Sequence, residues 1–271
     1  MENKVPVRFF AVTFVFSWSL WALAIILGSG SSQDLVYMSS GIVMPLMLIG
    51  AFGPAVGAFV SLRSIEGKGA IKNYCKKFLS LKFGWKVWFL MFLILGGSYF
   101  ISWIIPELFG EKRIPSFLPN FYIFPIYLLL MIFFGGGQEE IGWRGYILPY
   151  LEKRYGLIIG SLILGIIWAI WHIPLWFIPG TSQAYMNFMV FAFMTIGYSY
   201  IFSWVREASG ERLLSGLVIH GIANGFAAIF PTLIIENGAK QIRFWMYGII
   251  TLVIGIITVS IRYYKSRKTS A

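Results

Sequence analysis

Eight long apolar stretches, separated by short polar segments, make up most of this 271-residue chain. Each stretch is long enough for a helix to cross the hydrocarbon core of a bilayer, which takes roughly 20 residues. The pattern therefore predicts an all-α, polytopic membrane protein with about eight transmembrane helices. The predicted spans are residues 9–28, 37–62, 87–105, 121–152, 156–178, 184–205, 213–234 and 244–262.

Two of these stretches need comment. The first, from Phe9 to Leu27, is too long for the apolar region of a signal peptide, so we expect it to be a span. The fourth contains the run Gly135-Gly136-Gly137, where we expect the helix to bend. The spans leave no room for a soluble domain, and we expect residues 1–271 to form a single integral-membrane domain with a functional core at about residues 121–234.

The composition and charge distribution support this prediction. Hydrophobic residues make up 58% of the chain and charged residues 12%, whereas a soluble domain carries roughly 25% charged residues. With the N-terminus in the cytoplasm, seventeen lysines and arginines fall in inside segments and four in outside loops. We therefore predict a multi-pass protein of the cell membrane with both termini cytoplasmic. The net charge of +11 is explained by this topology and does not indicate nucleic acid, although the basic segment from Arg63 to Lys86 is expected to contact anionic lipid headgroups.

Several kinds of catalytic site can be excluded by counting residues. The single cysteine, Cys75, excludes an internal disulfide and a cysteine-based zinc site. An aspartyl protease needs two aspartates, and the chain has only Asp34, in a predicted outside loop. No H-E-x-x-H zinc motif and no G-x-S-x-G nucleophile motif occurs. Glutamate and histidine remain as the reactive groups.

Two adjacent glutamates lie in the fourth predicted span. Glu140 and Arg144 are four residues apart, which places them on one face of a helix and favours a buried ion pair that supports the structure. Glu139 points about 100° away from Glu140 around the helix. If Arg144 neutralises Glu140, then Glu139 is left free for proton transfer, since a glutamate in a dry site is a workable general base. A second structural carboxylate is the alternative.

Both histidines of the chain also lie in predicted spans. His172 follows Trp168 by one helical turn, and His220 and Asn224 share a helix face. Each alone is more typical of packing or interhelical hydrogen bonding. However, Glu139, His172 and Asn224 lie roughly 18–25 Å along a helix from the predicted cytoplasmic side, and His220 lies one turn shallower than Asn224. Helix tilt can absorb these differences in depth. Four polar groups on three spans can therefore meet at one depth in the membrane.

The order E-E-x-x-x-R, aromatic-x-x-x-H and H-x-x-x-N, each on its own predicted span, resembles the CPBP family. This family, also called Abi, comprises CAAX proteases and bacteriocin-processing enzymes and includes the type II CAAX prenyl endopeptidase. The resemblance covers Glu139 to Asn224 and extends to the eight-span layout, and the stretch Ala51–Pro54 also resembles one often seen in the family. The aromatic position is often Phe in the family and is Trp168 here. We expect this change to affect packing only and not to touch the polar groups.

The resemblance implies an intramembrane endopeptidase. Glu139 and His172 would activate a water molecule, His220 and Asn224 would stabilise the oxyanion, and the ion pair described above would support the site. The chemistry of these residues agrees with the implied roles. A carboxylate and an imidazole are suited to acid–base catalysis. Two hydrogen-bond donors on one helix face are suited to stabilising a developing negative oxygen. The substrate would be a membrane-associated peptide or protein with a prenylated C-terminus, a bacteriocin leader or a signalling-peptide precursor.

A metal-dependent site is the main mechanistic alternative. Glu139, His172 and His220 could bind zinc and leave the fourth position for water, and family members have often been labelled metalloproteases. We favour a mechanism without a required cofactor, because Asn224 is a poor zinc ligand but a good oxyanion donor.

Two other functions stay open at this point. A proton-coupled transporter would use buried glutamate and histidine to relay protons, but it predicts inverted repeats that the sequence lacks. A non-catalytic membrane partner, such as a bacteriocin immunity or scaffold protein, could share the fold. The oligomeric state is not indicated by the sequence.

Overall fold

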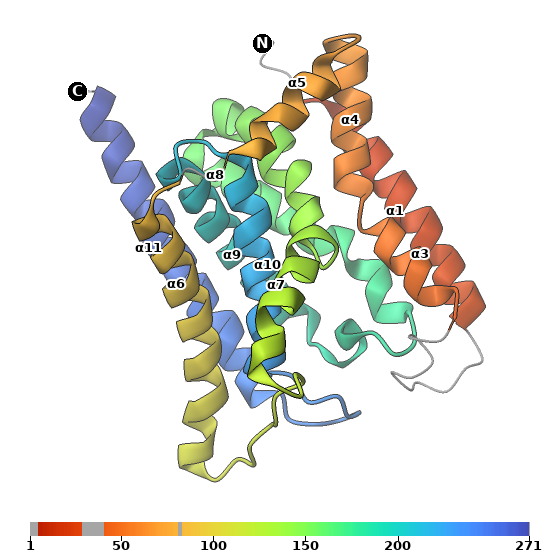
Figure 1. Cartoon of the computed structure of the whole chain (residues 1–271), viewed down its shortest axis with the longest axis vertical. Coiled ribbons are helices and arrows are strands. Elements are labelled where there is room, and N and C mark those ends of the chain that lie inside the picture. Colours follow the sequence, from red (N-terminus) through yellow and green to blue (C-terminus); the bar gives the residue numbers. More distant parts are fainter. Residues whose placement is uncertain (1–4, 29–40, 81–82, 271) are drawn as a thin grey trace.

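The computed structural model describes residues 5–28, 41–80 and 83–270, and within these residues all regular secondary structure is helical. Asp34 and the first residues of the second predicted span lie outside this part of the chain. The α-helices (Figure 1) are α1 (Val7–Gly28), α3 (Val43–Gly50), α4 (Gly53–Ile65), α5 (Ala70–Lys76), α6 (Trp85–Ile104), α7 (Phe124–Phe133), α8 (Leu148–Trp171), α9 (Phe188–Ala208), α10 (Leu213–Ile229) and α11 (Ile242–Ser270). Short 3-10 helices are η1 (Lys77–Leu79), η2 (Ile105–Phe109), η3 (Phe121–Ile123), η4 (Gly137–Ile141), η6 (Ile173–Phe177) and η7 (Ser182–Tyr185), and η5 (Trp143–Ile147) is a π-helix.

Helix length and composition identify a polytopic membrane protein. Five helical stretches of the described chain are long and apolar enough to cross a membrane, or six if α3 and α4, which meet at 43°, form one broken span. The count is below the eight predicted for two reasons. The fourth and fifth predicted spans fall within one 57-residue stretch, Phe121–Phe177, and the seventh corresponds to α10, a shorter apolar helix. The eight-span layout therefore stays a prediction.

The 57-residue stretch is not one straight helix. Gly156, inside α8, has φ 81° and ψ 167°, a backbone conformation that only glycine adopts readily. Beyond it the chain turns back, so that the hydroxyl of Ser161 donates to Oε1 of Glu152 at 3.1 Å. In a straight helix these residues would be about 13 Å apart along the axis. The turn therefore divides the stretch where the sequence separates the fourth and fifth spans.

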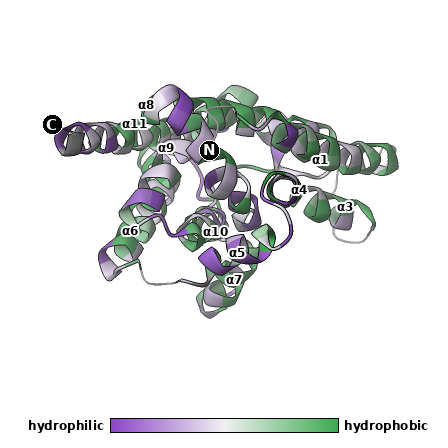
Figure 2. Ribbon diagram, turned by 90° about the horizontal axis from the view of Figure 1, so that it is seen from above, coloured by the Kyte–Doolittle hydropathy of each residue, from purple (hydrophilic) through white to green (hydrophobic). Residues whose placement is uncertain are grey.

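Helix α10 is the central element of the fold. It packs against α6, α7, α9 and η4, and Figure 2 shows it surrounded by the other helices. Gly221 and Gly225 lie directly against α7, where an added Cβ would meet Ile132 and Leu128. The absence of side chains at these glycines permits the close approach of α10 and α7. The polar residues of α10 are thereby placed in the interior of the molecule.

The outer helices expose apolar side chains, as expected of surfaces that face lipid. Exposed examples are Leu23 on α1, Phe89 on α6, Leu129 on α7 and Val253 on α11. The start of α1 and the end of α11 lie at the same end of the molecule (Figure 1), which suits an even number of crossings.

Near that end, α11 is tied to α8 and α9 by a buried arginine. The Arg262 guanidinium donates to Glu152 at 2.6 Å and to Glu207 at 2.8 Å. Arg262 is buried, and Lys265 lies 3.5 Å from Glu207 with its side chain mostly exposed. One guanidinium thus joins three helices.

Candidate active site

The glycine run interrupts the helix that precedes the paired glutamates. Helix α7 ends at Phe133, and Gly136 has φ 120°, which strongly favours glycine. The chain then continues as 3-10 helix η4 and π-helix η5 before α8 begins. The predicted bend is present, but the regular α-helical geometry assumed for Glu139, Glu140 and Arg144 is wrong. The glutamates lie on a 3-10 turn and the arginine on a π-turn, a form that often occurs at functional sites.

Two earlier segments hold this irregular stretch in place. Gly142 lies against the backbone of Pro54, which belongs to the Ala51–Pro54 stretch singled out in the sequence. The Tyr74 hydroxyl donates to the Ile141 carbonyl at 2.6 Å. Burial raises the pKa of the Tyr74 phenol well above its ordinary value, so the hydroxyl stays a hydrogen-bond donor. The segment is therefore fixed from the side of α4 and α5.

Glu140 is the centre of a buried charge cluster. Its Oε1 accepts from Nη1 of Arg144 at 2.9 Å and lies 2.9 Å from Nδ1 of His220. All three side chains are at most 5% exposed. The ion pair expected from the four-residue spacing is present, and it extends to a histidine on α10. Because a carboxylate oxygen only accepts, Nδ1 of His220 carries a proton in this arrangement.

Glu139 points elsewhere and has a different partner. Its Oε2 accepts from Nε1 of Trp168 at 2.8 Å, and both residues are buried. The expectation that the Trp168 ring leaves the polar groups untouched is therefore wrong. The sequence places Trp168 on the face of His172, but it does not reveal that an indole N–H reaches across to another segment.

His172 caps the end of α8, where the helix gives way to η6. Its Nδ1 lies 2.8 Å from the carbonyl oxygen of Trp168. A carbonyl only accepts, so Nδ1 is protonated and Nε2 is the nitrogen available to accept a proton. The imidazole also packs edge-on against Trp171 and Phe191.

His220 and Asn224 face the glycine loop from α10. The Asn224 side-chain amide donates to the carbonyl of Gly135. A Cβ added to Gly136 would collide with Nε2 of His220 and Nδ2 of Asn224. The missing side chain at Gly136 therefore keeps open the space in front of both groups. The glycine run predicted only a bend. The positive φ of Gly136 and its close approach to His220 and Asn224 were not predicted.

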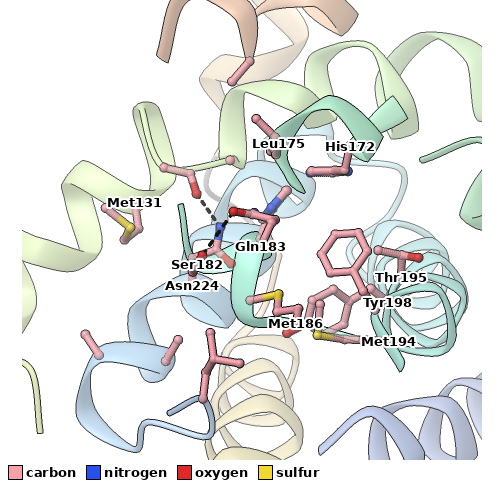
Figure 3. A pocket seen from close by; sticks show the side chains of 18 of the residues that line it. Met131, His172, Leu175, Ser182, Gln183, Met186, Met194, Thr195, Tyr198 and Asn224 are labelled. Carbon is pink, nitrogen blue, oxygen red and sulfur yellow. Dashed lines mark hydrogen bonds between the residues drawn. The ribbon is translucent and has the colours of Figure 1, made fainter. Parts of the chain in front are cut away.

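All four predicted site residues line one cavity of about 450 Å³. Glu139 comes from η4, His172 from the end of α8, and His220 and Asn224 from α10. Much of the remaining wall is apolar and includes Met131, Met186 and Met194, which Figure 3 shows around the same space as His172 and Asn224. Glu140 and Arg144 are buried behind this wall and are not among the lining residues.

Three tyrosines form a further part of the wall that the sequence analysis missed. The Tyr198 hydroxyl is hydrogen bonded to that of Tyr247, and it lies 3.5 Å from that of Tyr99. They come from α9, α11 and α6, and all three line the cavity. No spacing within one segment signals a cluster that is assembled from three helices.

The proposed zinc ligands do not fit a metal site in this geometry. Among the described residues no three His, Cys, Asp or Glu side chains are arranged to hold a metal ion. We therefore derive no step through a metal.

Comparison with known proteins agrees with the three motifs. Residues 119–226, which contain all of the motifs, match the model of the family described as Type II CAAX prenyl endopeptidase Rce1-like. The chain is also similar to CAAX prenyl protease 2 of Methanococcus maripaludis, with 26% identity over 251 residues that cover 86% of this chain and 89% of that protein. The motif region of the chain thus matches the Rce1-like type II CAAX prenyl endopeptidase family. The resemblance stated from the motifs is thereby confirmed.

The match to the Rce1-like family identifies this protein as a peptidase, and its substrate is a peptide or protein. The matched region contains α7, η4, η5, α8, α9 and most of α10, which together supply every predicted site residue. Helices α1, α3, α4 and α11 lie outside the matched range and pack around this region.

Proposed function

We propose that this protein is an intramembrane endopeptidase that hydrolyses a peptide bond of a membrane-associated substrate with an activated water molecule. The observation that carries this proposal is the convergence of Glu139, His172, His220 and Asn224 on one largely apolar cavity. A transporter does not require a carboxylate base and two hydrogen-bond donors in the wall of one cavity. A non-catalytic partner has no need for it either.

Glu139 and His172 form the proposed water-activating pair. Nε2 of His172 accepts a hydrogen bond from the water, because Nδ1 is already donating to a backbone carbonyl. Glu139 takes the water proton as the oxygen attacks the scissile carbonyl carbon. The same proton then passes to the nitrogen of the leaving amine as the C–N bond breaks, which returns Glu139 to its starting state.

His220 and Asn224 form the proposed oxyanion site. With Nδ1 of His220 bound to Glu140, donation from Nε2 requires the doubly protonated imidazolium. Charge balance favours that form, since Glu139, Glu140, Arg144 and an imidazolium sum to zero in a buried site. Asn224 Nδ2 uses one of its two hydrogens on Gly135 and has a second for the oxyanion. Donors of this kind contribute about 2.7–4 kcal/mol each to the transition state.

The proposed substrate is a peptide with an isoprenoid-modified cysteine near its C-terminus. The family and the relative's name support this class. The apolar wall of the cavity suits an isoprenoid chain, whose transfer from water contributes roughly 0.8 kcal/mol per buried CH₂. We further propose that the eight predicted segments cross the membrane with both termini in the cytoplasm, and that the chain forms one membrane domain.

The test is cleavage of a prenylated peptide and its unprenylated counterpart by purified protein in liposomes. Wild type is compared with Glu139→Gln, which keeps the shape of the side chain and removes the base. Glu111→Gln, a change of the same kind in an exposed segment, is the matched control. Cleavage of the prenylated peptide that is lost only in Glu139→Gln supports the proposal. Cleavage that survives in Glu139→Gln overturns it, and preference for the unprenylated peptide overturns the substrate class.

A further inference from the structure

Trp168 contacts four charged or reactive residues of the site: Glu139, His172, Arg144 and His220. Its indole N–H donates to Glu139, and its carbonyl oxygen accepts from His172. The Arg144 guanidinium lies over its ring, 4.4 Å from the ring centroid, and the His220 ring packs edge-on against it at 5.3 Å. The residue is 2% exposed. A side chain held on several sides in this way has little freedom to reorient.

We infer that Trp168 is the positioning residue of the acid–base pair, fixing the Glu139 carboxylate through its indole N–H and the His172 tautomer through its backbone carbonyl. The inference rests on the proposed function. It assigns a role to an aromatic residue whose ring alone would explain only packing.

The geometry explains why one residue can serve both groups. Trp168 and His172 are one helical turn apart, so the carbonyl of the first meets the ring of the second. Its side chain points across to η4, where Glu139 lies on a different segment. A carboxylate with one oxygen bound in this way cannot rotate freely, and its other oxygen is held in a set direction for the water.

Trp143 offers a matched control. It is also fully buried, it belongs to η5, and its Nε1 has no hydrogen-bond partner among the described residues. Trp168→Phe and Trp143→Phe therefore each remove one buried indole N–H and keep an aromatic ring, but only the first removes a bond to Glu139.

The first measurement is the cleavage kinetics of these two variants. Loss of a hydrogen bond to a charged acceptor should lower kcat of Trp168→Phe roughly 10- to 100-fold with KM within about twofold, because the substrate contacts are unchanged. Trp143→Phe should keep the wild-type kcat. Equal kcat values for the two variants would overturn the inference.

A second substitution covers the case in which Trp168→Phe does not fold. Replacing Trp168 by β-(3-benzothienyl)alanine puts sulfur in place of the N–H and keeps nearly the same ring shape. The same loss of kcat is expected at position 168, and none is expected when the analogue is placed at position 143. A wild-type kcat at position 168 would contradict the role of the N–H.

A double-mutant cycle that is read by unfolding rather than by cleavage separates this inference from the proposed function. Trp168→Phe is combined with Glu139→Leu, and the unfolding equilibrium constants in detergent are measured. A direct bond predicts non-additivity of about tenfold. If the two substitutions are non-additive in unfolding but the wild-type protein cleaves no peptide, the contact between Trp168 and Glu139 is retained and the proposed function is rejected. If the effects of the two substitutions on unfolding are additive, the contact itself is rejected.

Discussion

Nδ1 of His220 lies 2.9 Å from Oε1 of Glu140, although eighty residues separate them in the chain. The same oxygen accepts from Arg144, so one carboxylate holds a guanidinium and an imidazole in the interior of the molecule. Removing one partner from a buried charge cluster leaves the others unpaired, and this usually costs more stability than an exposed ion pair contributes.

Glu140→Gln should therefore destabilise the fold as well as impair cleavage. We expect a loss of about 3–5 kcal/mol in unfolding free energy, since Arg144 is left in the interior without its carboxylate. The measurement is denaturant unfolding in detergent, followed by tryptophan fluorescence. Glu107→Gln, which removes the partner of the exposed Arg113, is the control and should change stability little. Comparable losses in the two variants would show that Glu140 does not hold the cluster together.

Gly136→Ala should abolish activity by filling the space in front of the proposed oxyanion donors. The new methyl group would meet His220 and Asn224, and we expect kcat to fall at least about 100-fold, as when an oxyanion donor is lost. Gly67→Ala is the matched control, since Gly67 also has a positive φ, 82°, but no atom within 4 Å of an added Cβ. Both variants place a Cβ at a positive φ, so a comparable activity loss in the two variants would rule out blocking of the site as the cause.

Asn224→Asp should lower kcat without raising KM much. The substitution keeps the size of the side chain and removes both amide hydrogens, and losing one oxyanion donor costs about 10²–10³ in kcat. Steady-state kinetics on the prenylated peptide provide the measurement. Asn187→Asp is the control, because Asn187 caps α9 through its side-chain oxygen, and aspartate can do the same. A rise in KM at unchanged kcat would instead assign Asn224 to substrate binding.

Arg262→Met should weaken the attachment of α11 to α8 and α9. It leaves Glu152 and Glu207 without the buried cation, and we expect a loss of about 3 kcal/mol in unfolding free energy. Lys265→Met, at the exposed edge of the same network, should have a small effect. Denaturant unfolding in detergent measures both variants, and equal stability of the two would contradict the assignment of Arg262 as the residue that joins the three helices.

A strong chelator should leave cleavage unchanged. Glu139, His172 and His220 do not form a metal-binding arrangement among the described residues. The experiment is peptide cleavage after dialysis against chelator, with zinc added back in a parallel sample. Loss of activity that zinc restores would reassign Glu139, His172 and His220 as ligands.

The helical, membrane-spanning architecture could be predicted from the sequence because long apolar segments are read directly from the chain. The three motifs indicated the family. The estimated depths of the polar residues in the membrane predicted that Glu139, His172, His220 and Asn224 could meet. The spacing of Glu140 and Arg144 indicated an ion pair, and that pair is present. These features depend on local patterns or on distances along single helices.

The remaining features depend on how segments pack against one another. The 3-10 turn at Glu139 and the π-turn at Arg144 replace the regular helix that spacing alone predicts. The bond from Trp168 to Glu139 joins two segments whose relative rotation no single-segment pattern determines. The tyrosine cluster is assembled from three helices, so its members look like ordinary packing residues in the sequence.

The bond between Asn224 and the Gly135 carbonyl has a practical consequence for trapping substrates. A carbonyl released by a broken helix within a membrane needs a partner, and Asn224 supplies it here. A variant at position 224 therefore removes a bond to the glycine loop as well as an oxyanion donor. Glu139→Gln leaves that loop bond intact, so it is the better choice for capturing an uncleaved peptide and identifying what the enzyme encounters in its own membrane.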